Sequence, residues 1–148
     1  MKKEYLNDVL EALKEAKDLR WIDADEGQLD FYTRERPPVA WPCCLVDLSM
    51  PDARSLTAAA PDPQRCTLRA TLRIAFNDCA SLNMATPTPV RLTAMKRYDV
   101  LQQVKNCLHG KWFSGFQQPY TRISCTPEPR EDGIKVFQMV FETAVLEI

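Results

Sequence analysis

Cysteine and histidine are the side chains of this sequence best suited to binding a metal or attacking a substrate. The chain has six cysteines and one histidine, but no two cysteines have the C-x-x-C spacing of a zinc site. Cys43 and Cys44 are adjacent, and neighbouring side chains on a strand point to opposite faces. His109 falls at the end of a predicted helix, where the helix dipole favours a cation. We therefore predict no metal site and no catalytic pair of nucleophile and base.

The cysteines need another explanation, because an even number also suits disulfides. The lysines near the N-terminus are followed by Asp8, Glu11 and Glu15, so we expect no secretory signal. Disulfides are rare in proteins that stay in the cytosol. Free cysteines are commonly buried as small hydrophobic side chains. The sequence thus favours six reduced, buried cysteines over a disulfide framework.

Motifs for phosphate binding or covalent catalysis do not occur in the sequence. It contains no G-x-x-x-x-G-K, G-x-G-x-x-G or G-x-S-x-G segment and has four glycines in total. The acidic segment 23–27 resembles a calcium loop, but its glycine stands one position earlier than in an EF-hand. We interpret this segment as an acidic turn. We expect a protein without enzymatic activity, metal or cofactor.

The segment 66–76 has the most regular strand pattern in the chain. Successive side chains of a strand point to opposite faces, so one set belongs to a core and the other faces water or a partner. The second set includes Thr67, Arg69, Thr71 and Arg73. Because arginine is enriched at protein interfaces, two interpretations of this surface remain: a subunit contact and a solvated sheet face.

Length and composition indicate a single domain spanning residues 1–148. The chain has 45% hydrophobic and 26% charged residues, as in ordinary globular proteins. Its formal net charge of −1 gives no basic footprint for sequence-specific binding to nucleic acid or for attraction to an anionic membrane. No apolar run approaches the roughly 20 residues that span a bilayer. A membrane or nucleic-acid partner is therefore not expected.

The predicted elements combine two helices with several strands. Apolar spacing predicts amphipathic helices at 2–19 and 94–109, the second with Thr93 as its N-cap. Proline-rich stretches at about 51–65 and 77–93 are expected to be long loops, which are commonly functional. The strands are expected at 43–49, 66–76, 120–126 and 134–148, with a short fifth strand near Trp21. This order predicts an α+β fold in which two helices pack on one face of a mainly antiparallel sheet of four to five strands.

Taken in order, these segments resemble the tail terminator and tail-completion proteins of long-tailed bacteriophages and prophages. The resemblance rests on a Pro-flanked strand at Ala40–Ser49, on the alternating strand Thr67–Phe76, and on a helix whose end, Val104–Gly110, runs into an aromatic turn. It is closest in the C-terminal half, where Tyr120-Thr-Arg122 precedes a charged turn and the long strand Lys135–Thr143.

The resemblance implies a structural virion protein. Members of this family have an α+β fold, use no cofactor and are not enzymes; they assemble as rings, often hexamers, that terminate the tail tube and join it to the head connector. The implied partners are further copies of the chain, the tail tube protein and the head-connector protein. The implied location is the virion tail, with the host cytoplasm during assembly. We expect the polar side of the strand at 66–76 and the two loops to form the subunit contacts. The alternative interpretation is a small bacterial ligand-binding or interaction domain without catalytic activity.

Overall fold

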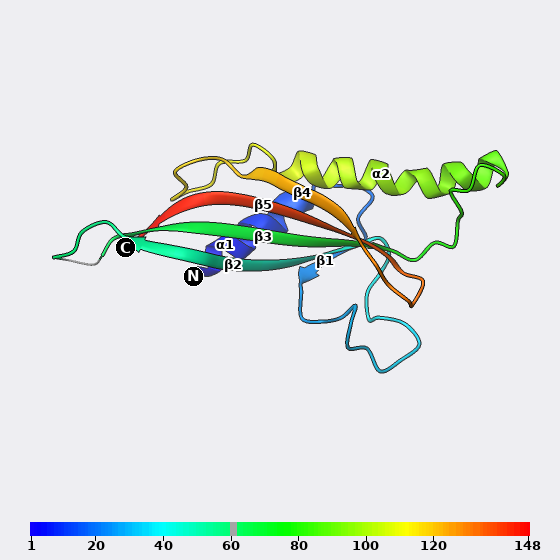
Figure 1. Ribbon diagram of the computed structural model, residues 1–148, viewed down its shortest axis with the longest axis horizontal. Coiled ribbons are helices and arrows are strands. Elements are labelled where there is room, and N and C mark those ends of the chain that lie inside the picture. The colour runs from blue at the N-terminus through cyan, green and yellow to red at the C-terminus, as the bar shows by residue number, and fades with distance from the viewer. Residues whose placement is uncertain (60–61) are drawn as a thin grey trace.

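The computed structural model describes residues 1–59 and 62–148, in which two helices accompany a five-stranded sheet (Figure 1). In chain order the elements are α1 (Lys3–Leu13), β1 (Trp21–Ala24), β2 (Cys43–Ser55), β3 (Gln64–Phe76), α2 (Thr88–Leu108), β4 (Thr121–Glu128) and β5 (Lys135–Glu147). The strand order across the sheet is β1-β2-β3-β5-β4; β1 runs parallel to β2, and the other neighbours are antiparallel. The predicted α+β fold with a mainly antiparallel sheet is confirmed.

The long helix α2 begins at Thr88, six residues before the predicted start. Pro87 is its N-cap residue and Pro89 lies in its first turn, where proline is tolerated because the N–H groups there have no partner inside the helix. The connection before the helix is therefore 77–87, and the predicted loop 77–93 is too long. Thr93 lies inside the helix instead of capping it, and its Oγ1 donates a hydrogen bond to the Pro89 carbonyl at 3.1 Å.

The loop predicted at 51–65 is mostly strand. β2 continues to Ser55, and β3 starts at Gln64. Pro51 lies at a register shift between Ser49 and Asp52, and such irregular positions tolerate proline inside a strand. The connection is 56–63, of which Ala60 and Pro61 lie outside the described residues. The first helix is likewise shorter than predicted, because α1 ends at Leu13.

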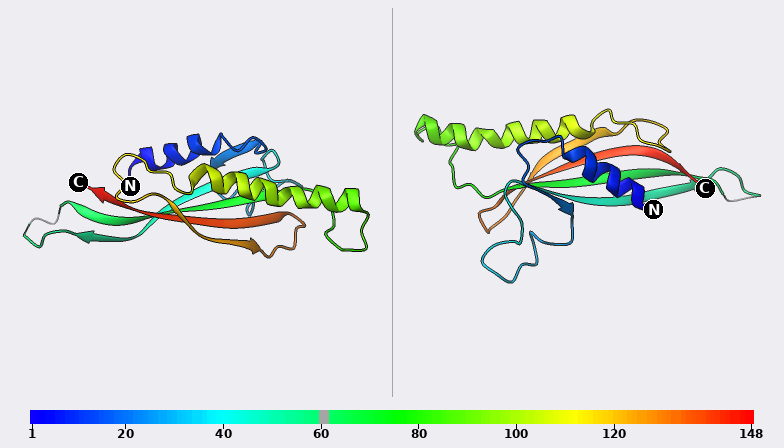
Figure 2. Two further views of the ribbon diagram at one scale, coloured as in Figure 1. Left: turned by 90° about the horizontal axis from the view of Figure 1, so that it is seen from above. Right: turned by 180° about the vertical axis from the view of Figure 1, so that it is seen from behind.

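The main core lies between the helices and one face of the sheet. The buried side chains of α1 and those of α2 from Val100 onward belong to a single cluster with the apolar set of β3, from Cys66 to Phe76. Figure 2 shows both helices on the same side of the sheet. Phe116 and Tyr120 close the core beyond the end of α2, with their ring centroids 5.0 Å apart. Trp112 of the same aromatic turn is exposed.

A smaller buried cluster lies on the opposite face, at the end of the sheet where β1 pairs with β2. It consists of Leu29, Cys43, Leu45, Ala75, Ile134 and Val136, with Val39 and Trp41 packed against it. The segment 25–42 supplies Leu29, Val39 and Trp41, so it folds over this end of the sheet. The rest of that face has no helix over it in the part of the chain that the structure describes (Figure 1).

The six cysteines are unpaired in the structure. Cys43, Cys44, Cys66 and Cys107 are buried as predicted, and burial raises the pKa of the Cys43 thiol to about 12. The prediction is wrong for Cys79 and Cys125, which are exposed. Cys79 lies in the connection 77–87, and Cys125 lies on β4, the last strand at one edge of the sheet.

A thiol reagent is therefore expected to modify two cysteines of the folded protein, Cys79 and Cys125. Unfolding in denaturant without reductant should raise the number to six, because the other four thiols are excluded from solvent by packing. Intact mass spectrometry counts the adducts. Fewer than six adducts after unfolding would reveal a disulfide and contradict the prediction.

Candidate subunit interface

The four residues predicted at an interface share one face of β3, opposite the core. Thr71 pairs in register with Asp47 of β2 and Val140 of β5, and Arg69 pairs with Ser49 and Glu142. The face is therefore built from three long antiparallel strands, and it is polar because its side chains alternate with those that pack under the helices.

The centre of this face is charge-balanced and accessible. Arg69 forms an ion pair with Glu142, in which the Nε–Oε2 and Nη2–Oε2 distances are both 2.6 Å. The two side chains remain 42% and 26% exposed, so the pair is partly solvated. Thr67 Oγ1 donates a hydrogen bond to Asp52 Oδ1 at 3.0 Å, and Thr71 is half-buried. This surface can contact another protein without leaving an isolated charge.

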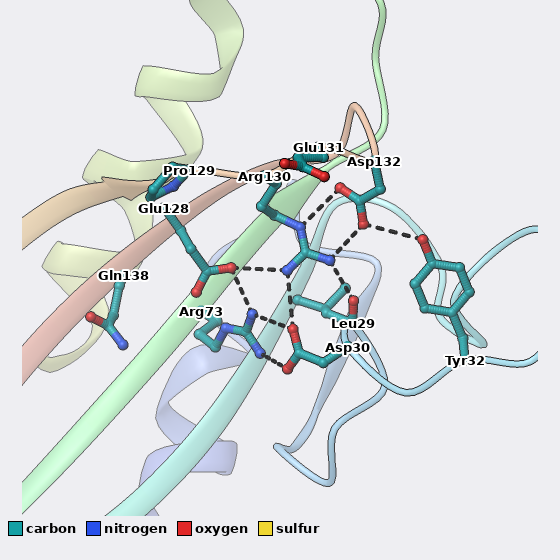
Figure 3. Close-up of a pocket in the computed structure, with 10 residues that line it drawn as sticks. All are labelled: Leu29, Asp30, Tyr32, Arg73, Glu128, Pro129, Arg130, Glu131, Asp132 and Gln138. Carbon is teal, nitrogen blue, oxygen red and sulfur yellow. Dashed lines mark hydrogen bonds and ion pairs between the residues drawn. The ribbon is translucent and has the colours of Figure 1, made fainter.

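Arg73 differs from the other three, because the structure buries it. It is 8% exposed, whereas the sequence alternation predicts a side chain directed to water or a partner. Its Nη1 lies 2.7 Å from Asp30 Oδ2, and its Nη2 lies 2.7 Å from Glu128 Oε2 (Figure 3). The segment 25–42 covers this end of the sheet and brings Asp30 onto the guanidinium. Arg73 is thus held inside the chain and is not available to a partner.

Arg130 lies beside Arg73 and extends the same ion-pair network (Figure 3). Its Nη1 is 2.9 Å from Glu128 Oε2 and 3.2 Å from Asp30 Oδ1, and its Nη2 is 2.6 Å from Asp132 Oδ2. The same nitrogen donates to the Leu29 carbonyl. The two arginines therefore connect β3, the segment 25–42 and the turn between β4 and β5.

The network carries more carboxylates than guanidinium groups. Arg73 and Arg130 face Asp30, Glu128 and Asp132, and Asp25 lies 3.6 Å from Arg73. The two arginines, Asp30, Glu128 and Asp132 line an open depression of about 770 Å³. Because the terminal nitrogens of both arginines are already paired with carboxylates, the arrangement acts as a clamp between three segments rather than as a receptor for an anion.

Hydrogen bonds from the arginines lower the pKa values of the carboxyl groups in the clamp. A hydrogen bond from Arg130 holds the pKa of Asp132 at about 2, against burial, and a hydrogen bond from Arg73 lowers the pKa of Asp30. Burial alone would raise the pKa of Glu128, but hydrogen bonds from both arginines outweigh it and lower that pKa too. The folded state therefore favours the ionised form of all three carboxyl groups.

The clamp predicts a specific loss of stability in acid. A carboxyl group with a lowered pKa in the folded state stabilises the protein above its ordinary pKa, and this contribution disappears as the pH falls toward the folded value. We expect the wild-type thermal midpoint to fall between about pH 5 and pH 2 more steeply than that of Arg130→Met. Lys14→Met is the matched control, because it removes the exposed pair with Glu11. Parallel curves for wild type and Arg130→Met would contradict the assignment.

Sequence reasoning identified Arg73 but missed its partners. Asp30 and Glu128 are 43 and 55 residues away from Arg73 in the sequence, and Asp132 lies in the charged turn before the last strand. The available signal for these partners was the arginine itself, which lies within a regular strand pattern. If such an arginine is buried, it must pair with carboxylates. His109 lies at the C-terminal cap of α2, as predicted, and its Nδ1 accepts a hydrogen bond from the Arg122 N–H at 3.0 Å.

The sequence matches no known family model, and no curated protein matches it. Among the described residues, no group of three or more histidine, cysteine, aspartate or glutamate side chains could hold a metal ion. In the same residues, no helix is long and apolar enough to cross a membrane.

Proposed function

We propose that this chain is a structural virion protein of a long-tailed phage or prophage, which forms a ring that terminates the tail tube and joins it to the head connector. The order of its elements and its α+β fold are those that the family resemblance implies. In this proposal the chain contacts further copies of itself, the tail tube protein and the head-connector protein. It works by presenting surfaces and carries out no reaction.

The observation that carries the proposal is the helix-free part of the sheet around Thr71. Three strands of 13 residues each form this platform, and both helices lie on its other side. Its polar, charge-balanced character matches subunit contacts that form between already folded proteins, which are about as polar as ordinary protein surface. Arg69 supplies the residue type enriched at such contacts.

The edges of the sheet favour contact through the face rather than through strand pairing. β1 covers only the first part of the outer edge of β2. The uncovered part of that edge carries Pro51 at a register shift. The edge strand β4 carries Pro127 and a second shift between Arg122 and Ser124. Prolines and bulges are the features that stop edge strands from pairing with other chains. A neighbouring subunit would therefore meet the polar platform, with residues 56–59 at one end of it and the connection 77–87 at the other.

A charged substitution at the centre of the platform tests the proposal. Thr71→Lys should abolish a discrete oligomer several times heavier than the 16.9 kDa chain, because an added charge would be buried without a partner at the contact. Asn7→Lys is the control, since Asn7 is exposed on α1, on the other side of the molecule. Analytical ultracentrifugation gives the assembly state, and circular dichroism reports folding. An oligomer unaffected by Thr71→Lys would remove this face from the interface.

A further inference from the structure

The first half of α2 exposes apolar side chains that nothing in the described chain covers. Leu92 is 58% exposed and Met95 is 50% exposed, whereas Tyr98, one turn later, packs its ring edge-on against Phe137 of β5. Leu82 and Met84, in the connection that leads to the helix, are exposed as well. Figure 1 shows why: this part of α2 extends past the end of the strands. Leu92 and Met95, three residues apart on the helix, form an exposed apolar patch, and such a patch commonly marks a contact with another protein.

This end of the helix is fixed in place rather than loosely attached. Arg97 is buried, and its Nε lies 2.9 Å from Asp78 Oδ2. Its Nη2 also donates to the Ala80 carbonyl at 2.8 Å. These bonds hold the connection 77–87 against the helix. Because Ala94 and Arg97 face inward, Leu92 and Met95 lie on the outward side of a rigid helix.

The charges beside this patch are complementary to a second copy of the same helix. Arg91 and Asp99 lie four residues before and after Met95, on the same side of the helix. Neither has an ion-pair partner among the described residues. When two such helices pack antiparallel about a two-fold axis at Met95, Arg91 of each copy comes to the level of Asp99 of the other. Two identical ion pairs then flank a centre of Leu92 and Met95.

We infer that the outward face of α2 from Arg91 to Asp99 binds the same face of a second copy in an antiparallel, two-fold contact. Such a contact is isologous, whereas neighbours around a ring contact each other through two different surfaces. The inference therefore adds a second contact, separate from the platform around Thr71, that joins two free chains or two assembled rings. The contact uses one face of a single helix, from Arg91 to Asp99, so the pairing is expected to be reversible.

A reciprocal exchange of the two charges tests this contact in the full-length protein. Arg91→Asp and Asp99→Arg should each weaken pairing at least about tenfold, because each places like charges together at two symmetric positions. The double variant R91D/D99R restores both ion pairs and should return the dissociation constant to within about threefold of wild type. Lys105→Asp is the control, since it reverses a charge on the same helix six residues beyond Asp99. Sedimentation equilibrium over a concentration series measures pairing, and circular dichroism confirms folding.

The outcomes separate this contact from the proposed ring. The two-fold contact is supported, whether or not the ring forms, if pairing persists in Thr71→Lys, weakens in each single charge variant and returns in R91D/D99R. A wild type with no pairwise association at any concentration overturns it. The inference is also overturned if Leu92→Asp abolishes association but the double variant R91D/D99R pairs no better than the single charge variants. The helix would then bind a different surface.

Discussion

Leu108→Ala is expected to lower the free energy of unfolding by about 2–5 kcal/mol, as Leu→Ala changes in a well-packed core do. Leu108 is fully buried near the end of α2, in the cluster that also contains the buried residues of α1 and one face of the sheet. Its removal leaves a cavity where three elements meet, and the surrounding side chains close it only in part. Urea denaturation followed by circular dichroism measures the change.

Leu92→Ala is the matched control on the same helix. Because Leu92 is exposed, the same change there should alter stability by less than about 0.5 kcal/mol at protein concentrations low enough to prevent self-association. Equal losses for the two variants would contradict the assignment of the inward face of α2.

Arg73→Met is expected to lower the free energy of unfolding by about 2–3 kcal/mol at neutral pH. The variant keeps much of the side-chain volume but leaves Asp30 and Glu128 with Arg130 alone. Removing one partner of a fully buried ion pair commonly costs about 3–5 kcal/mol, and the loss here is smaller because the Asp30 side chain is 37% exposed and can be hydrated. The segment 25–42 should also become easier to cleave by proteases.

Arg69→Met provides the comparison for this prediction, four residues earlier on the same strand face. Its pair with Glu142 is partly solvated, so the expected loss is at most about 1 kcal/mol. The difference between the two variants should shrink in acid, since the carboxylates that Arg73 binds become protonated. A loss for Arg73→Met no larger than that for Arg69→Met would show that the clamp does not stabilise the fold.

The elements with a clear repeat could be predicted from the sequence, and those that depend on distant contacts could not. The alternation in 66–76 located β3, and the apolar spacing after residue 94 located most of α2. The prolines at 51, 87 and 89 were interpreted as loop residues, because proline usually ends regular structure. In the fold they occupy a bulge and the start of a helix, two positions at which the missing N–H costs little.

The placement of the side chains on the outer face of β3 was predicted in part for the same reason. A period of two assigned Thr67, Arg69, Thr71 and Arg73 to one face, and the structure places them there. The period could not reveal that the segment 25–42 folds over Arg73, because that contact depends on a chain connection with no repeat of its own. Nor could it reveal the exposed side of α2, since the residues from Arg91 to Thr93 were assigned to a loop.

Electron cryomicroscopy of the purified wild-type protein can show whether the chain assembles into a ring. We expect closed rings in which the polar face of β3, with Arg69 and Thr71 at its centre, contacts a neighbouring subunit. Particles that remain single chains at every accessible concentration, or rings whose contacts leave this face bare, would contradict it.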